Sequence, residues 1–269
     1  MKEFKNAVAA ITGAASGIGR CLAINLAKEG CGLALADIDP EGLNQTADMI
    51  KDNGVKITTH VLDVADREQV YGFADDVVAE HGKVNLVVNN AAVGLAETLE
   101  DVTYEDLNWL LGINLWGVIY GSKAFLPYLK QQPEGHIVNI SSVNGFFTNR
   151  NNGPYCTSKF AVRGFTLTLC QELKDSTVRV SCVHPGGIKT NIVRNARFIK
   201  ASDPELSHAE AVEHFDKRIA WTSADKAARI IVKGIKKNKT RILVGFDAYI
   251  YDLLTRLFPG MWQKLVARL

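Results

Sequence analysis

Short apolar segments alternate with segments of helical periodicity, and this alternation constrains the fold more than any other feature of the sequence. Helical patterns follow each of the first four apolar segments, all within the first half of the chain. Strands that alternate with helices form a parallel sheet, because each helix carries the chain back to the starting edge. Seven segments are expected to be strands: 7–12, 31–36, 56–62, 84–88, 136–141, 178–183 and 240–244.

These strands predict an α/β fold, a single doubly wound Rossmann-type domain over residues 1–269 with a seven-stranded parallel sheet and helices on both faces. The helical pattern over 103–130 is continuous and predicts one long helix. An apolar content of 47% and a charged content of 22% are typical of a globular protein that buries a full core.

Charge and cysteine content exclude several classes of function. The net charge of +2 and the scattered basic residues argue against a nucleic-acid partner. The five cysteines at 21, 31, 156, 170 and 182 have no metal-ligand spacing, so no metal site is predicted. Their odd number and their positions within apolar segments favour buried, reduced thiols and a cytoplasmic location. No leader or membrane-spanning segment is expected.

A glycine-rich turn follows the first expected strand. Gly13, Gly17 and Gly19 are spaced G-x-x-x-G-x-G, and a helical pattern begins directly after them. Such a turn lets backbone N–H groups at a helix N-terminus approach a phosphate. A glycine-rich turn can also be purely structural, and its spacing here differs from the G-x-G-x-x-G of other dinucleotide folds.

An acidic residue ends the second expected strand. Asp37 lies eighteen residues after Gly19, where a doubly wound sheet places the acid that binds the adenosine ribose. A carboxylate there accepts hydrogen bonds from both ribose hydroxyls and repels a 2′-phosphate. Ser16 occupies the position at which a basic residue would bind such a phosphate. This arrangement favours NAD over NADP, and an ordinary loop acid is the structural alternative.

Tyr155 and Lys159 lie four residues apart, so on a helix they share one face. A nearby ammonium group is expected to lower the pKa of the phenol and so create a general acid/base. Ser142, at the end of a strand, could reach the same point. Asn114 lies among apolar residues and is either a core amide satisfied by the backbone or an amide that holds a water molecule near the lysine. The dyad alone is also compatible with an ordinary helix face.

The ordered set of motifs resembles the short-chain dehydrogenase/reductase family in its shorter form, from about residue 5 to 245. Its motifs are Thr12-Gly13-x-x-x-Gly17-Ile18-Gly19, Asn89-Asn90-Ala91, Asn114, Ser142, Tyr155-x-x-x-Lys159 and Pro185-Gly186. Ala92 departs from the glycine that the family usually has. The resemblance implies hydride transfer between NAD and a secondary alcohol or ketone, in a homodimer or homotetramer. The alternatives are an NADPH-dependent carbonyl reductase and a catalytically idle dinucleotide-binding sensor.

The resemblance also implies residue roles. Asn114 resembles the asparagine that holds a water in a proton relay, and Ser142 the serine that orients the substrate oxygen. Tyr155 resembles the catalytic acid/base, and Lys159 the lysine that lowers its pKa and binds the nicotinamide ribose. The implied cofactor contacts are Gly13, Ser16, Gly17, Ile18, Gly19, Asp37, Asp63, Val64, Asn90, Ala91, Tyr155, Lys159, Pro185, Ile188 and Thr190.

The remaining segments are expected to shape the substrate side. Residues 191–222 correspond to a substrate-binding lid, and Val143, Phe146 and Phe147 are expected at the pocket mouth, with 93–95 on another wall. These apolar residues suit a lipophilic alcohol such as a steroid, a retinoid-like molecule or a fatty hydroxyl compound. Residues 247–269 form an extension, expected as two short helices separated at Pro259-Gly260. This tail could dock within the protein or an oligomer, which is favoured, or lie on a membrane surface.

Overall fold

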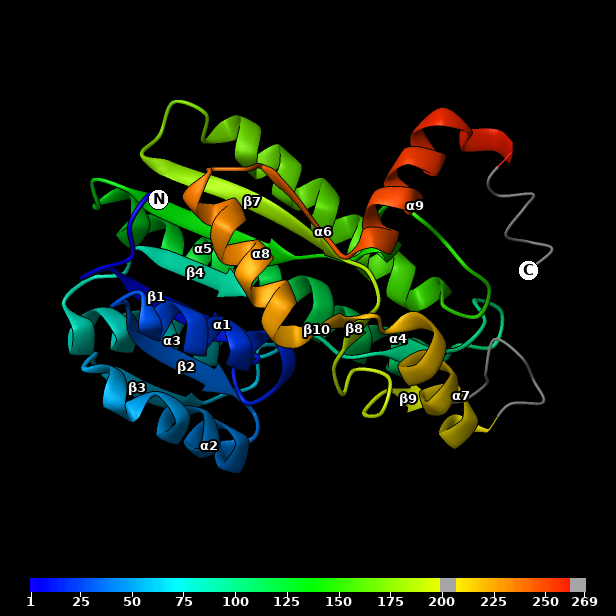
Figure 1. Ribbon diagram of the computed structural model, residues 1–269, viewed down its shortest axis with the longest axis horizontal. Coiled ribbons are helices and arrows are strands. Elements are labelled where there is room, and N and C mark those ends of the chain that lie inside the picture. Colours follow the sequence, from blue (N-terminus) through cyan, green and yellow to red (C-terminus); the bar gives the residue numbers. More distant parts are fainter. Residues whose placement is uncertain (199–206, 262–269) are drawn as a thin grey trace.

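Seven parallel strands form one sheet at the centre of the molecule (Figure 1). The computed structural model describes residues 1–198 and 207–261. Across the sheet the strands follow the order β11-β7-β6-β4-β1-β2-β3. Their bounds are β1 Val8–Thr12, β2 Gly32–Asp37, β3 Ile57–Val61, β4 Leu86–Asn89, β6 Gly135–Ile140, β7 Val178–Pro185 and β11 Arg241–Val244. The predicted doubly wound sheet is confirmed, and its order reverses between β1 and β4.

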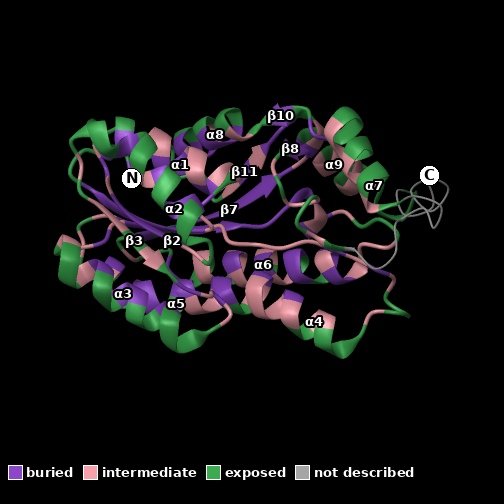
Figure 2. Ribbon diagram, turned by 90° about the horizontal axis from the view of Figure 1, so that it is seen from below, coloured by how far each residue is buried: buried purple, intermediate pink, exposed green. Residues whose placement is uncertain are grey.

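Helices cover both faces of the sheet (Figure 2). One face carries α1 (Gly17–Lys28), α2 (Pro40–Ile50) and α8 (Ala224–Lys236), and the other carries α3 (Arg67–His81), α5 (Gly117–Lys130) and α6 (Gly153–Glu172). Side chains of a strand alternate between the faces, so β1 supplies Ala9 and Ile11 to one core and Val8 and Ala10 to the other. Because both faces are buried, the strands read as continuous apolar segments rather than as alternating ones.

The segment expected as one helix over 103–130 contains a change of helix type. Thr103 caps α4 (Tyr104–Leu111), a π-helix follows at Gly112–Trp116, and α5 continues from Gly117. A Cβ atom on Gly117 would lie 2.9 Å from a methyl carbon of Val64, and one on Gly121 would lie 2.1 Å from Oδ1 of Asn89. The glycines therefore allow close packing at these two positions, and the π-helix interrupts the single helix expected over 103–130.

A buried polar network joins the central strands to the helices. Asn89 on β4 donates to Oδ1 of Asn139 on β6 at 2.8 Å and to Ser122 on α5 at 3.1 Å. Asn139 in turn donates to the hydroxyl of Thr166 on α6 at 3.1 Å. These bonds fix the register of β4 against β6 near the ends from which the functional loops emerge.

Short elements border the carboxyl ends of the strands. They are β5 (Leu95–Ala96), a 3-10 helix at Val143–Gly145, β8 (Ile188–Lys189), β9 (Arg197–Phe198), α7 (His208–His214), a π-helix at Phe215–Ile219, β10 (Thr222–Ser223) and α9 (Phe246–Leu257), with a further 3-10 helix at Lys51–Asn53 after α2. The segment expected as a lid pairs with the main body twice, through β9 with β5 and β8 with β10. Its residues 199–206 lie outside the described part of the chain.

The C-terminal extension begins as a helix that packs on the body. α9 ends at Leu257, so the break falls at Phe258, just before the predicted Pro259-Gly260, and residues 259–261 are helical again. The rest of the expected second helix lies outside the described residues. Within the described residues, none of the helices combines the length and apolar character needed to cross a membrane.

The cysteines follow the prediction in part. All five are free thiols, and Cys31, Cys156 and Cys182 are buried. Cys21 and Cys170 are only half-buried, at the edges of the two cores. No cluster of three or more potential metal-ligating side chains occurs within residues 1–198 and 207–261.

The buried His136 on β6 is expected to make the stability of the protein depend on pH. Burial lowers the pKa of His136 to about 3, with Nε2 bonded to Ser181 at 2.8 Å and Nδ1 without a hydrogen-bond partner in the described chain. An unfolded histidine titrates near pH 6.5, so below that pH protons favour the unfolded state. We expect the free energy of unfolding to fall from pH 7 to pH 4, with roughly 1–2 kcal/mol at pH 5 contributed by this one residue.

Urea unfolding of the native protein and of His136→Gln, compared at pH 7 and pH 5, measures this effect. The variant removes the titrating group, so its stability should depend less on pH. Equal pH dependence in the two proteins would contradict the assignment.

Candidate active site

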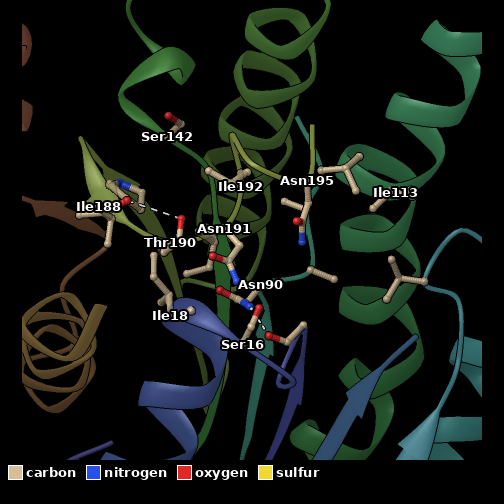
Figure 3. A pocket seen from close by; sticks show the side chains of 18 of the residues that line it. Ser16, Ile18, Asn90, Ile113, Ser142, Ile188, Thr190, Asn191, Ile192 and Asn195 are labelled. Carbon is tan, nitrogen blue, oxygen red and sulfur yellow. Dashed lines mark hydrogen bonds between the residues drawn. The ribbon is translucent and has the colours of Figure 1, made fainter. Parts of the chain in front are cut away.

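A cavity of about 360 Å³ opens at the carboxyl ends of the strands (Figure 3). Figure 3 shows Ser16 and Ile18 at the start of α1, with Ile188 and Thr190 on the opposite chain segment. The predicted site residues that line it are Gly13, Ser16, Gly17, Ile18, Asp37, Asp63, Val64, Asn90, Ala91, Ser142, Tyr155, Lys159, Pro185, Ile188 and Thr190. Gly19 and Asn114 do not line it. Residues far apart in the sequence meet here because the carboxyl ends of parallel strands share one edge of the sheet.

The glycine-rich turn needs glycine for two reasons, backbone conformation and close packing. Gly13 (φ 68°) and Gly17 (φ 54°) adopt left-handed backbone conformations. A Cβ atom on Gly19 would lie 2.1 Å from the carbonyl oxygen of Gly13, so α1 and the strand could not approach as they do. The turn therefore brings the N-terminus of α1, with its free N–H groups, to the wall of the cavity.

Two polar side chains hold this turn in place. Asp37 accepts a hydrogen bond from the backbone N–H of Ala15 at 2.9 Å through one carboxylate oxygen, and from that of Asp39 at 3.2 Å through the other. Asn90 donates to the carbonyl oxygens of Thr12 and Gly13 at 3.0 and 3.1 Å. Asp37 is half-buried and still faces the cavity, so its carboxylate keeps acceptor capacity toward a ligand.

Ser142, Tyr155 and Lys159 meet on one side of the cavity. Tyr155 and Lys159 lie in the first two turns of α6, and Ser142 follows β6 directly. The Nζ atom of Lys159 lies 5.5 Å from the centre of the Tyr155 ring and donates to the carbonyl oxygen of Ile140 at 3.2 Å. The predicted juxtaposition of hydroxyl, phenol and ammonium groups is present.

The direction of the tyrosine pKa differs from the expectation. Burial raises the pKa of Tyr155 to about 12, although a hydrogen bond from Ser142 opposes this shift. Burial also lowers the pKa of Lys159 to about 8. Desolvation disfavours the charged form of both groups, and here it outweighs their mutual attraction. The sequence shows that the two residues are neighbours but does not show how deeply they are buried.

Backbone contacts fix the serine segment. Nδ1 of His184, on β7, lies 2.9 Å from the carbonyl oxygen of Ser142. A carbonyl can only accept, so Nδ1 carries the proton in this contact. Burial lowers the pKa of His184 to about 4, which keeps the ring neutral at pH 7. The hydroxyl of Ser142 accepts from the N–H of Asn144 at 3.1 Å.

Asn114 is a fully buried amide within the π-helix. Its Oδ1 accepts from the N–H of Val93 at 2.8 Å, and its Nδ2 donates to the carbonyl oxygen of Val93 at 3.0 Å and to Ser158 at 3.3 Å. The side chain therefore holds the loop after β4 against α6. This matches the structural alternative for Asn114, and the role in a water relay stays a prediction.

Several expected pocket residues lie elsewhere. Val143 and Phe146 are buried with Ala248 of α9, and Phe147 stacks on Tyr251 with ring centres 4.7 Å apart. They pack the loop against the C-terminal helix and do not line the cavity, because α9 covers them. Of 93–95, only Val93 lines it. The lining residues that sequence reasoning did not assign include Ile38, Leu62, Trp109, Ile113 and Ile140, whereas Asn191, Ile192, Asn195 and Phe215 belong to the segment expected as the lid.

The lid segment is held to α4 by a basic residue. Arg197 on β9 pairs with Asp106 at 2.8 Å, and its guanidinium carbon lies 3.8 Å from the centre of the Trp109 ring. The apolar wall of Trp109, Ile113, Ile192 and Phe215 thus joins α4, the π-helix and both described parts of the lid. The helical spacing of Trp109 and Ile113 (i, i+4) could have indicated a shared face, but not which face.

Comparison with known proteins agrees with this geometry. The family model for short chain dehydrogenases matches residues 7–199. The chain belongs to the short-chain dehydrogenase family. As a member of this family it is an oxidoreductase with a Rossmann-type fold.

Other oxidoreductases match over nearly the whole chain. The protein SadH of Mycobacterium tuberculosis is 42% identical over 269 residues, which cover 99% of this chain and 96% of SadH. A short-chain dehydrogenase/reductase from Burkholderia phymatum, solved in complex with NAD, has a TM-score of 0.87 at 31% identity and covers 97% and 96% of the two chains. Carveol dehydrogenase from Mycobacterium avium, in complex with NAD, has a TM-score of 0.80 at 28% identity and covers 91% and 98%.

The packing of Gly19 yields a prediction for this short-chain dehydrogenase. Gly19→Ala places a methyl group 2.1 Å from the carbonyl oxygen of Gly13, so either the turn or α1 must move. We expect a loss of about 1–3 kcal/mol in stability and a clear loss of dinucleotide affinity. Thermal unfolding and a fluorescence titration with NAD measure the two effects.

Gly72→Ala is the matched control, because a Cβ atom there meets nothing within 4 Å in the interior of α3. It should leave affinity unchanged and raise stability slightly, by about 0.5–1 kcal/mol. If the two substitutions have the same effects on stability and on NAD affinity, the close approach of Gly19 to Gly13 is not needed for the structure of the turn.

Proposed function

We propose that this chain transfers a hydride between NAD and a lipophilic secondary alcohol or ketone. One observation carries the proposal: Ser142, Tyr155 and Lys159 line the same cavity as the glycine-rich turn. The packing of a parallel sheet does not require a hydroxyl, a phenol and an ammonium group to meet at the end of a strand. The NAD complexes of the Burkholderia phymatum and Mycobacterium avium neighbours support the choice of cofactor.

The residues of the turn fit a dinucleotide. Glycine at 13 and 17 supplies the left-handed backbone of the turn, and the N-terminus of α1 offers N–H donors to a pyrophosphate. Asp37 would accept from the adenosine ribose, and the polar and small residues at the ends of β3 and β4, Asp63, Val64, Asn90 and Ala91, would border the cofactor. When bound, NAD supplies the carbon that accepts or returns the hydride.

Tyr155 would move the proton of the substrate oxygen. With its pKa near 12 the phenol is neutral at pH 7, so in this state it is ready to donate to a ketone oxygen. Ser142 would hold that oxygen through its hydroxyl. The ammonium group of Lys159 would favour the phenolate that forms after donation. Because burial lowers the pKa of Lys159 to about 8, most of this group still carries its charge at pH 7.

Asn114 would act by positioning the loop after β4 against α6. Its side-chain bonds to Val93 and Ser158 tie the cavity loop to the helix that carries Tyr155 and Lys159. The resemblance implies that Asn114 also holds a water molecule in a proton relay.

The substrate would lie under residues 191–222, on the apolar wall of Trp109, Ile113, Ile192 and Phe215. Apolar and aromatic lining with few polar groups favours a lipophilic molecule. The neighbour named for carveol, an apolar cyclic secondary alcohol, supports this substrate class.

Assembly into a homodimer or homotetramer is part of the proposal. Large side chains are exposed on the side of the molecule formed by α4, the π-helix and α6: Tyr104, Trp116 and Phe160. Exposed aromatic residues gathered on neighbouring helices are typical of an interface between copies.

The tyrosine carries the sharpest test of the chemistry. Tyr155→Phe removes the proton donor and keeps the ring, so we expect turnover to fall by about 10²–10⁴ while NAD affinity stays within a few fold. Oxidation of a panel of secondary alcohols, read at the nicotinamide absorbance, and a separate NAD titration give both values.

Tyr128→Phe serves as the control, since that hydroxyl bonds Asp75 on the surface, and it should leave turnover unchanged. Near-normal turnover in Tyr155→Phe would refute the assigned role. A native protein that binds NAD but turns over no alcohol or ketone would instead indicate a dinucleotide-binding sensor.

Asp37 tests the choice of cofactor. The native protein should prefer NAD over NADP, because the carboxylate repels a 2′-phosphate. Asp37→Asn keeps an acceptor for the N–H of Ala15 but removes the charge, so the ratio of kcat/KM for NAD to that for NADP should fall about tenfold or more.

Asp39→Asn is the control for this test, because Asp39 caps α2, asparagine caps equally well, and its side chain does not line the cavity. A native protein that prefers NADP would favour the alternative of an NADPH-dependent carbonyl reductase.

A further inference from the structure

The hydrogen-bond ladder between β6 and β7 cannot continue as far as Ser142. The N–H of Ser141 donates to the carbonyl oxygen of Val183 at 2.8 Å. In a parallel ladder the next donor from β7 would be the N–H of Pro185, two residues further along. Proline has no N–H group. The main chain of β7 therefore leaves the segment that begins at Ser142 without the donor that a ladder would supply.

A side chain of β7 supplies a donor to this segment instead. Nδ1 of His184 lies 2.9 Å from the carbonyl oxygen of Ser142 and carries the proton, because a carbonyl can only accept. The same oxygen also accepts from the N–H of Gly145 at 3.0 Å, and the Ser142 hydroxyl accepts from the N–H of Asn144 at 3.1 Å. Those two bonds lie within the turn itself. His184 is thus the group that joins the carbonyl of Ser142 to the sheet.

Packing fixes the imidazole ring of His184. The residue is 1% exposed, and its ring meets that of Phe146 edge-on, with the centres 5.2 Å apart. The guanidinium carbons of Arg241 and Arg163 lie 5.1 and 6.0 Å from the centre of the Phe146 ring. Burial lowers the pKa of His184 to about 4, and both guanidinium groups act in the same direction. The ring is therefore neutral at pH 7 and has a single N–H to donate.

We propose that His184 is a positioning residue for hydride transfer, because its Nδ1–H fixes the main chain of Ser142 and thereby the direction of the Ser142 hydroxyl. This inference rests on the proposed function, in which that hydroxyl holds the substrate oxygen. His184 does not itself line the cavity, so it acts through Ser142. The Ser142 hydroxyl also bonds Tyr155, so a rotation of Ser142 would disturb both groups that act on one oxygen.

Three substitutions separate the donor of His184 from its volume. His184→Asn attaches an amide nitrogen to the same carbon that carries Nδ1 in histidine, so an N–H can still reach the carbonyl of Ser142. His184→Gln moves the amide one carbon farther out, and His184→Leu fills space without any donor. Asparagine is the smallest of the three, so this variant leaves the largest gap beside Phe146 and should be no more stable than the glutamine variant.

Steady-state kinetics with a secondary alcohol and NAD test the proposal. In His184→Gln and His184→Leu we expect kcat to fall about ten- to a hundredfold, because a small misplacement of a reacting group has effects of this size. NAD affinity, measured by fluorescence titration, should stay within a few fold. His184→Asn should retain most of the native kcat although it is no more stable in thermal unfolding. A role in packing alone predicts that activity follows stability.

His136→Leu is the matched control. His136 is also fully buried, but it lies at the amino end of β6, at the edge of the sheet opposite the cavity, where it bonds Ser181. This variant should lose stability and keep the native kcat. Circular dichroism shows whether each variant is folded.

A nitrogen NMR spectrum of histidine-labelled protein tests the donor without reference to activity. We expect a neutral imidazole ring with its proton on Nδ1, which does not titrate from neutral pH down to about pH 5. The signal of this ring should be missing in His184→Asn.

Several outcomes would overturn the role of His184 and leave the proposed function in place. In an active native enzyme these are equal impairment of the asparagine and glutamine variants, native kcat in all three variants, or a His184 ring with its proton on Nε2. A native protein that turns over no alcohol or ketone would instead refute the proposed function, and the positioning role with it.

Discussion

The site depends on the contact between the ends of β1 and β4, the two strands between which the sheet order reverses. The hydroxyl of Thr12 accepts from the N–H groups of Asn90 and Ala91 at 3.0 and 3.1 Å, and the Asn90 side chain donates back to Thr12 and Gly13. These bonds join two turns that would otherwise diverge, because the helices after them lie on opposite faces of the sheet. These bonds therefore fix the position of the glycine-rich turn, which forms one wall of the crevice at the point where the strand order reverses.

Burial controls the chemistry of the groups on the other wall. Ser142, Tyr155 and Lys159 gather where β6 meets α6, and solvent reaches little of Lys159. Desolvation holds the phenol protonated and makes the ammonium group easier to deprotonate. The same burial strengthens the electrostatic interaction of these groups with any charge placed beside them, because the local dielectric constant is low. At neutral pH the proton therefore stays on the Tyr155 phenol in this state of the site.

Sequence reasoning succeeded where a pattern has a single physical solution. Alternating strands and helices allow few topologies, and parallel strands bring Gly13, Asp37 and Ser142 to one edge whatever the details of packing. It was wrong where the outcome depends on which surface a side chain meets. Phe146 and Phe147 were expected at the pocket mouth, but α9 covers them, and that contact spans about a hundred residues of sequence. The pKa of Tyr155 likewise depends on burial, which spacing does not reveal.

The C-terminal helix connects the outer surface to the cavity. Asp247 bonds the N–H of Gly187, and a Cβ atom on Gly186 would lie 2.0 Å from the same carboxylate, so the stretch after β7 closely fits the start of α9. That stretch supplies Pro185 and Ile188 to the cavity. At its other contact, Tyr251 packs on the loop that follows Ser142. A displacement of α9 would therefore also shift the segments that carry Pro185 and Ser142, because tightly packed groups move together.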